Sequence, residues 1–189
     1  MSKGEQAQKR IVEAANALIY QQGYNTTSIS DVANAIGVTK GNLQYHFRSK
    51  EDLLEAVINF RLKEIDKQLQ HWELEYPTPT LRLKRFVQMI VNEEVSLVRF
   101  GCPMGSLNME LGKSQKLLQA KSLVMFNCYL AWLEKQFRTI DNRNGKSLSR
   151  HLMTRAQGAA LMAYIYQDPK WLKDECKQIN SWIDTQVST

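Results

Sequence analysis

Apolar residues recur with the period of an α-helix along almost the whole chain. Near the N-terminus, Ile11, Ala14, Ala15, Leu18 and Ile19 follow the spacing that places side chains on one side of a helix. The sequence shows no strand-like alternation, internal repeat or low-complexity tract. Only four Pro and nine Gly occur in 189 residues, which favours long helices over a β-sandwich rich in turns. We therefore predict an all-α protein of about nine helices.

Size and composition exclude several classes of protein. A chain of 189 residues with 43% hydrophobic and 23% charged residues suits a globular fold and excludes disorder, collagen and a disulfide-rich scaffold. The cysteines, Cys102, Cys128 and Cys176, lack the spacing of a zinc site, so reduced thiols in a cytoplasmic protein without a metal are expected. The N-terminus lacks the apolar core of a signal peptide, and no membrane-spanning stretch is predicted.

The first 50 residues carry the pattern of a helix-turn-helix. Ser28-Ile-Ser-Asp31 has the form of a capping box, Gly37 can end the short helix that follows, and Thr39 can cap the next one. In a helix-turn-helix the second helix enters the DNA major groove with its N-terminal residues on base edges. Those residues here are Thr39, Lys40, Gly41 and Asn42.

Residues 11–58 also resemble the DNA-binding domain of the TetR family of bacterial repressors. The matching segments are Ile36-Gly-Val-Thr39 and the run from Gly41 to Leu54, which includes Tyr45-His-Phe47 and Lys50. The resemblance implies contacts to DNA phosphate or to the groove for Thr27, Ser28, Thr39, Lys40, Gly41, Asn42, Gln44, Tyr45, His46 and Lys50. Gln44 departs from the family, which usually has Tyr or Phe there; a glutamine can read adenine or touch phosphate.

Charge supports an anionic partner for this part of the chain. Residues 1–50 hold a net charge of +3, half of the total of +6, in about a quarter of the length. We therefore expect residues 1–50 to form a DNA-binding domain. Residues 51–189 would then form a helical domain for ligand binding and dimerisation, joined to the first by a long helix that starts near Ser49.

The last two predicted helices are the candidate dimer interface. A stripe of small and apolar residues permits close packing of helices, and large apolar side chains can anchor it. A two-fold pairing would place two DNA-reading helices on one palindromic operator. The predicted interface residues are Leu152, Ala156, Ala160, Tyr164, Ile179, Trp182 and Ile183.

A ligand pocket is implied by the resemblance rather than by spacing, since aromatic and Met side chains at helical spacing also form ordinary cores. Met-rich walls adapt to varied apolar ligands. The candidate lining is Phe86, Met89, Phe100, Cys102, Met104, Met125, Tyr129 and Trp132. A small apolar or electrophilic inducer would release the homodimeric repressor from its operator.

Two alternatives accompany this interpretation. The segment Gly101-Cys102-Pro-Met-Gly105 resembles that of family members that sense electrophiles or oxidants through the cysteine, so Cys102 is a candidate sensor thiol. The rival from another class is an all-helical enzyme. The sequence offers it no phosphate loop and no paired metal-binding histidines, so no catalytic residue and no cofactor are predicted.

Overall fold

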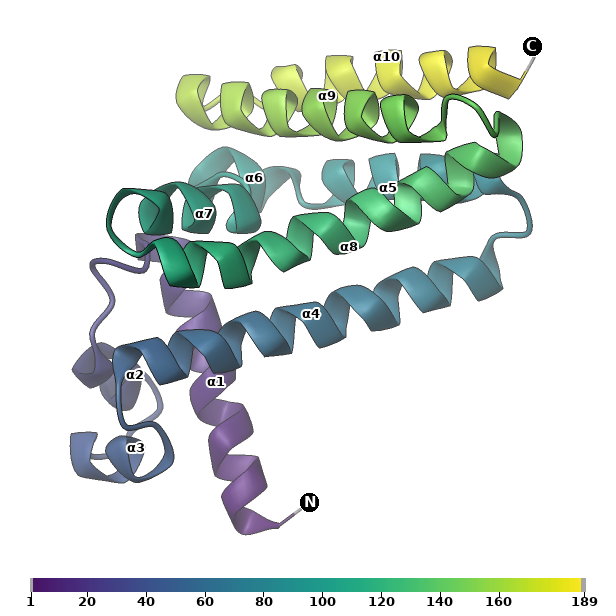
Figure 1. Cartoon of the computed structure of the whole chain (residues 1–189). Helices are drawn as coiled ribbons and strands as arrows, with labels where there is room; N and C mark the ends of the chain where they lie inside the picture. Colours follow the sequence, from purple (N-terminus) through teal and green to yellow (C-terminus); the bar gives the residue numbers. More distant parts are fainter. Residues whose placement is uncertain (1, 188–189) are drawn as a thin grey trace. The chain divides into compact units, whose positions relative to one another are not determined.

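The computed structural model describes residues 2–187 and consists, over that range, of ten helices without a strand (Figure 1). The predicted all-α class is therefore confirmed. The helices are α1 (Lys3–Gln22), α2 (Ile29–Ala35), α3 (Lys40–His46), α4 (Lys50–Glu75), α5 (Pro79–Asn92), α6 (Glu94–Phe100), α7 (Pro103–Ser114), α8 (Lys116–Ile140), α9 (Gly145–Tyr166) and α10 (Lys170–Val187).

Side-chain caps set the beginnings of the N-terminal helices. The Ser28 hydroxyl accepts from the Asp31 N–H at 3.1 Å, while the Asp31 carboxylate accepts from the Ser28 N–H at 2.8 Å, which completes the predicted capping box. Thr39 caps α3 through the Asn42 N–H at 3.2 Å. Gly23 ends α1 with φ 91° and Gly37 follows α2 with φ 70°, conformations that favour glycine.

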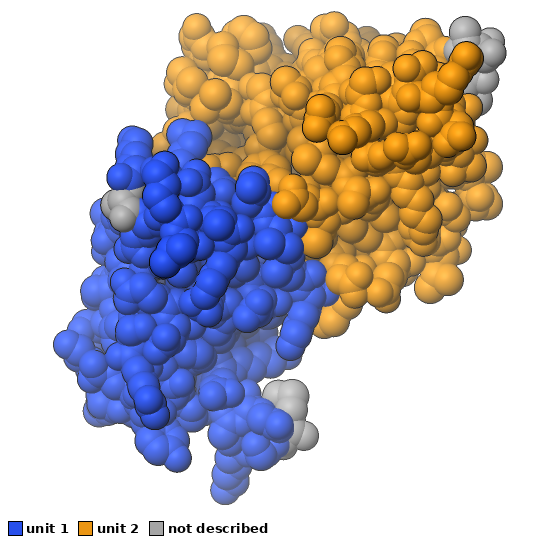
Figure 2. Space-filling view, viewed as in Figure 1, with its two compact units in different colours: residues 1–64, 106–125 blue, residues 65–105, 126–189 orange. Residues whose placement is uncertain are grey.

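The described chain divides into two compact units (Figure 2). Unit 1 comprises residues 1–64 and 106–125, and unit 2 comprises residues 65–105 and 126–189. The predicted boundary at residue 50 separates two expected functions, DNA binding before it and ligand binding with dimerisation after it. That division stays a prediction. Three helices, α4, α7 and α8, contribute residues to both units.

Unit 1 has its own apolar core. It is built by one side of α1, by α2 and α3, and by the first half of α4. Its buried members are Ile11, Val12, Ala15, Ile19, Val32, Ala33, Leu43, Phe47, Leu53, Leu54, Val57 and Ile58. The turn after α1 adds Tyr24, which is also fully buried. Together they fix α2 and α3 against α1.

Unit 2 has a second core, in which α10 packs against both α5 and α9. Its buried side chains include Trp72, Leu83, Phe86, Val87, Ile90, Leu133, Phe137, Leu152, Ala156, Ala160, Leu172, Ile179 and Ile183. Ion pairs join the same helices: Lys84 to Asp184 at 2.6 Å, and Arg155 to Glu175.

The predicted helix over residues 80–100 is divided. α5 ends at Asn92, and Glu93, with ψ 12°, donates its N–H to the carbonyls of Met89 and Val91 before α6 begins. The short segment expected at 106–111 is the middle of α7, a helix of 12 residues. Because no Gly or Pro lies near Glu93, the sequence held no signal for this break.

Candidate nucleic-acid interface

Helix α3 exposes nearly all of its surface to solvent. Leu43 alone among its seven residues is buried, and it anchors the helix in the core of unit 1. Lys40, Gly41, Asn42 and Gln44 are exposed, as is the neighbouring cap residue Thr39.

Tyr45 is 86% exposed, which is unusual for an aromatic side chain. The half-buried His46 imidazole lies 5.3 Å from the Tyr45 ring in an edge-on arrangement. The exposed surface of this short helix thus carries a cation, two amides and an aromatic hydroxyl, groups that bind base edges and phosphate.

The N-terminus of α2 holds a polar, exposed cap. Ser28 and Asp31 are both exposed, and hydrogen bonds from the Ser28 hydroxyl and N–H lower the pKa of Asp31. Asp31 is therefore a capping group, as its position in the box predicted. Ser28 remains placed where a phosphate could approach.

Thr27 does not fit its predicted role. Its side chain is 3% exposed, and its hydroxyl donates to the Gly23 carbonyl at 2.7 Å and accepts from Gln22 Nε2 at 3.3 Å. This hydroxyl stabilises the turn between α1 and α2, so we correct the expectation that it touches phosphate.

Lys50 lies at the same turn. Its ammonium donates to the Asn25 carbonyl at 3.2 Å and sits 4.3 Å from the centre of the Tyr24 ring. Burial lowers the pKa of Lys50, while the carboxylates of Glu51, Glu110 and Asp31 oppose that change. An ammonium has three N–H donors, so this contact leaves capacity for a phosphate.

Glu110, on α7, was missed by the sequence analysis. Its Oε2 accepts from the Asn25 N–H at 3.0 Å, and its carboxylate stands so close to Gly23 that an added Cβ would meet Oε1 at 2.8 Å. The turn that leads to Ser28 is thus held on one side by Glu110 and on the other by Lys50. Asn25 and Glu110 are 85 positions apart, so no local pattern could have revealed this contact.

Only some of the predicted ligand residues lie near one another. In unit 2 the rings of Phe86 and Tyr129 lie 5.7 Å apart, and the Tyr129 hydroxyl lies 3.7 Å from Met89 Sδ and donates to Gln68 Oε1 at 2.9 Å. Burial, helped by Cys102 and Cys128, raises the pKa of Tyr129.

The other predicted ligand residues differ in their surroundings. Trp132 packs edge-on against Trp72, whereas Met125 is buried in unit 1. Phe100, Cys102 and Met104 are half-buried, and Cys102 Sγ accepts from the Gly105 N–H at 3.4 Å.

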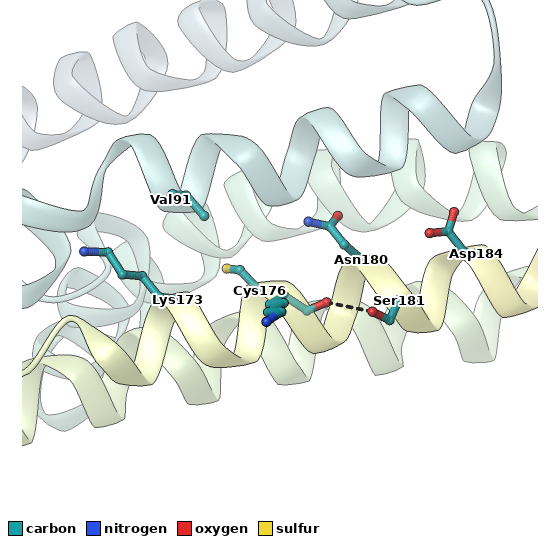
Figure 3. Close-up of a pocket in the computed structure, with 7 residues that line it drawn as sticks. Val91, Lys173, Cys176, Asn180, Ser181 and Asp184 are labelled. Atoms are coloured by element: carbon teal, nitrogen blue, oxygen red, sulfur yellow. Dashed lines mark hydrogen bonds between the residues drawn. The ribbon is translucent and has the colours of Figure 1, made fainter.

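A groove of about 350 Å³ lies along α10 and α5, lined by Val91, Lys173, Cys176, Lys177, Asn180, Ser181 and Asp184 (Figure 3). None of the predicted ligand residues lines it, and five of its seven lining residues carry polar or charged side chains. Burial raises the pKa of the Cys176 thiol to about 11, so this thiol is protonated at neutral pH.

The predicted dimer interface needs correction. Leu152, Ala156, Ala160, Ile179 and Ile183 are buried within the single chain, because α9 and α10 turn these sides toward each other and toward the rest of unit 2. Trp182 is half-buried against Phe137 and His151. Of the predicted set, only Tyr164 is exposed.

A different face of α9 and α10 is apolar and open to solvent. Its large exposed side chains are Leu161, Tyr164, Ile165, Tyr166 and Trp171. Gly158, one turn before Leu161, is exposed, and a Cβ added there would meet nothing within 4 Å. We call these six residues the α9–α10 face.

Residues 2–187 hold neither a metal-binding cluster nor a membrane-spanning helix. No cluster of three or more His, Cys, Asp or Glu side chains could hold a metal ion there. Within the same range, no helix combines the length and apolar character required to cross a membrane.

Comparison with known proteins relates part of this chain to a family of regulators. Residues 11–57 match the family model of bacterial regulatory proteins of the tetR family. An uncharacterised HTH-type transcriptional regulator in the lacX 3′ region of Lactococcus lactis subsp. lactis is 33% identical over 105 residues, 54% of each chain. AcrR of Shigella flexneri, an HTH-type transcriptional regulator, is 28% identical over 48% of this chain and 42% of its own. This chain thus spans about half the length of these curated relatives.

Solved structures match almost the whole chain. A TetR transcriptional regulator from Legionella pneumophila is 26% identical, with a TM-score of 0.83 over 99% of this chain and 98% of its own. One from Chloroflexus aurantiacus shares the fold at 22% identity, with a TM-score of 0.85 over 97% of both chains. The matched residues hold the helix-turn-helix, and the fold is that of a transcriptional regulator that carries this domain. Residues 11–57 thus match the tetR family, and the chain is similar in fold to a TetR transcriptional regulator over nearly its full length.

The contact between Glu110 and Asn25 can be tested by amide exchange. In Glu110→Ala, the Asn25 N–H loses its acceptor, and a hydrogen bond worth about 1 kcal/mol corresponds to roughly three- to tenfold faster exchange. Glu110→Gln keeps an acceptor oxygen and should change the rate less. Glu94→Ala, which removes an ion-paired carboxylate from unit 2, is the control. Unchanged Asn25 exchange in Glu110→Ala would contradict the assigned contact.

Proposed function

We propose that this chain is a sequence-specific DNA-binding transcriptional regulator that reads the major groove with α3. The observation that carries the proposal is the exposure of six of the seven residues of α3 in whole or part, while Leu43 alone fixes the helix. A helix exposed on so much of its surface has little role in the chain's own core.

The proposed DNA contacts divide into two kinds. Lys40, Asn42 and Gln44 carry donors and acceptors suited to base edges, and Gly41 allows close approach of the backbone. Ser28, Tyr45, His46 and Lys50 are proposed to contact phosphate, together with Thr39 at the start of α3. The net charge of +3 on residues 1–50 supports phosphate contact.

We further propose a homodimer acting as a repressor on a palindromic operator in the cytoplasm. A single helix-turn-helix binds weakly, and two heads on one dimer gain affinity by binding together. The α9–α10 face is the proposed contact between protomers, because it gathers large apolar side chains that the single chain leaves in water.

A small molecule would control this repressor through unit 2. To release DNA, the ligand must bind the released conformation better than the DNA-bound one. Two aromatic pairs, Trp72 with Trp132 and Phe86 with Tyr129, support this location, since α4, α5 and α8 contribute to them.

Control through Cys102 is a second candidate. The thiol sits just before α7, and its sulfur accepts a hydrogen bond from the Gly105 N–H inside the first turn of that helix. Alkylation there would add bulk beside Gly105 and Gln157, the side chain nearest to Gly105.

The two kinds of DNA contact predict two kinds of variant. Asn42→Ala should change which sequences are bound. Lys50→Met should weaken binding to all sequences alike and lower the salt slope by about one charge. Both effects are measured by fluorescence anisotropy with labelled duplexes across a salt series. Lys63→Met, which removes an exposed cation from α4, is the control. A normal salt slope in Lys50→Met would mean that Lys50 only holds the turn.

The proposed dimer contact can be tested by measuring the molar mass of the protein in solution. Leu161→Glu combined with Ile165→Glu should lower dimer affinity more than tenfold, because four carboxylates would be buried in each two-fold contact. Light scattering should change from about twice 21.8 kDa toward the monomer mass. Val95→Glu on α6, at a side chain 79% exposed, should leave the dimer intact. A wild-type chain that is monomeric at micromolar concentration would contradict the homodimer.

The Cys102 candidate predicts a selective loss of response. N-ethylmaleimide should release wild-type protein from its DNA and should not release Cys102→Ala. Cys128→Ala, which removes another half-buried thiol of unit 2, is the matched control and should respond like the wild type. Release of Cys102→Ala at the wild-type rate would exclude the thiol as a sensor.

A further inference from the structure

Two opposite charges bind the same residue in the turn between α1 and α2. The Glu110 carboxylate accepts from the Asn25 N–H at 3.0 Å, and the Lys50 ammonium donates to the Asn25 carbonyl at 3.2 Å. Glu110 comes from α7, Lys50 begins α4, and all three residues belong to unit 1. Asn25 is thus fixed from both sides, shortly before the exposed cap residue Ser28.

Glu110 is fitted closely into this turn. Its side chain is half-buried, and a Cβ added at Gly23 would meet its Oε1 at 2.8 Å. Gly23 also has a φ of 91°, a conformation in which other residues are strained. The glycine therefore makes room for the carboxylate, and a larger residue at position 23 would displace it.

The Glu110 carboxylate keeps its negative charge at the turn. A peptide N–H has a dipole but no net charge, so the hydrogen bond from Asn25 does not neutralise the carboxylate. The charge reaches Lys50, because Glu110 is one of the carboxylates that act to raise the pKa of Lys50 against the effect of burial. Lys50 is a proposed phosphate contact, and a phosphate bound there would be repelled by Glu110.

Two other carboxylates near Lys50 have roles in their own helices. Asp31 completes the capping box of α2, and Glu51 lies in the first turn of α4, where a negative charge stabilises the start of a helix. Glu110 lies in the second half of α7, where the helix dipole offers no such benefit. Its position is explained by the turn that it holds.

We propose that Glu110 is a positioning residue that sets DNA affinity through two opposed effects. Its acceptor oxygen holds the turn before Ser28, so less conformational entropy is lost when DNA binds. Its negative charge repels the phosphate at Lys50 and weakens binding. DNA affinity is therefore lower than the same turn would give without the charge. This inference rests on the proposed phosphate contact of Lys50.

The test uses three variants at one position. Glu110→Gln keeps an acceptor oxygen and removes the charge. Glu110→Asp keeps the charge but withdraws the carboxylate from Asn25 by one methylene group, and Glu110→Ala removes both. Each full-length variant is titrated into a labelled duplex of mixed sequence, and binding is followed by fluorescence anisotropy from about 50 to 200 mM salt.

The two effects together predict one order of affinity. Glu110→Gln should bind about two- to fivefold more tightly than the wild type at low salt, and screening should reduce this gain as salt rises. Glu110→Asp should bind most weakly, roughly threefold below the wild type, because the hydrogen bond is lost while the charge remains. Glu110→Ala should lie between these two variants. Asp174→Asn removes an exposed carboxylate from α10, changes the net charge equally and should leave the affinity unchanged.

Two other orders would overturn the inference. If Glu110 serves only the structure of the turn, Glu110→Gln will bind like the wild type, and Glu110→Asp and Glu110→Ala will be equally weak. If only its charge matters, Glu110→Gln and Glu110→Ala will be equally tight, and Glu110→Asp will match the wild type. A gain in Glu110→Gln that does not depend on salt would also contradict the repulsion.

The outcome separates this inference from the proposed DNA binding. A wild type that binds no duplex at the lowest salt would contradict the proposed function, and this inference with it. A wild type that binds while Glu110→Gln shows no gain would contradict the inference alone. Thermal melting checks that each variant is folded. If Glu110→Asp or Glu110→Ala does not fold, the salt-dependent gain of Glu110→Gln, present or absent, decides.

Discussion

Helix α4 has 26 residues, and it packs apolar side chains into the core of unit 1 near its start and into the core of unit 2 near its end. Its first half places Leu53, Leu54, Val57 and Ile58 in the core of unit 1, and its second half places Leu69 and Trp72 in the core of unit 2. Burial of such side chains contributes about 1.5–3 kcal/mol each, so both ends of α4 are firmly tied to their units. The same helix starts at Lys50, beside the turn before α2, and carries Trp72, beside the proposed ligand. One continuous helix therefore carries residues of both proposed sites. It connects the proposed ligand site directly to the proposed DNA-binding site.

The turn at residues 23–27 shows how the DNA-reading part is fixed. Local chemistry supplies half of it: a glycine with positive φ, a threonine hydroxyl on the Gly23 carbonyl, and the capping box at Ser28. The other half comes from far along the chain, through the Glu110 carboxylate on the Asn25 N–H. An acidic residue of α7 thereby acts on a turn that leads directly to a proposed phosphate contact. This contact gives unit 1 a residue through which a change in α7 could alter DNA affinity.

Prediction from the sequence succeeded for features that depend on residues close together in the chain. The caps at Ser28 and Thr39, the glycine at position 37 and the buried side of α1 all follow from spacing within one or two turns of helix. It failed where the partner is distant. Spacing marks Leu152, Ala156 and Ala160 as a stripe for close packing, but it does not say whether the partner helix belongs to the same chain. The structure gives α10 and the rest of unit 2 as that partner.

The central claim, that α3 reads DNA as part of a dimer, is tested most directly by selecting bound sequences from random duplex DNA with the purified chain at physiological salt. The account predicts a palindromic consensus whose two half-sites are separated by a spacing that one rigid dimer can span. The selection is repeated with protein unfolded and refolded without ligand, which removes any bound molecule that holds it in a released state. Folded, dimeric protein that still enriches no sequence after this step would contradict the claim.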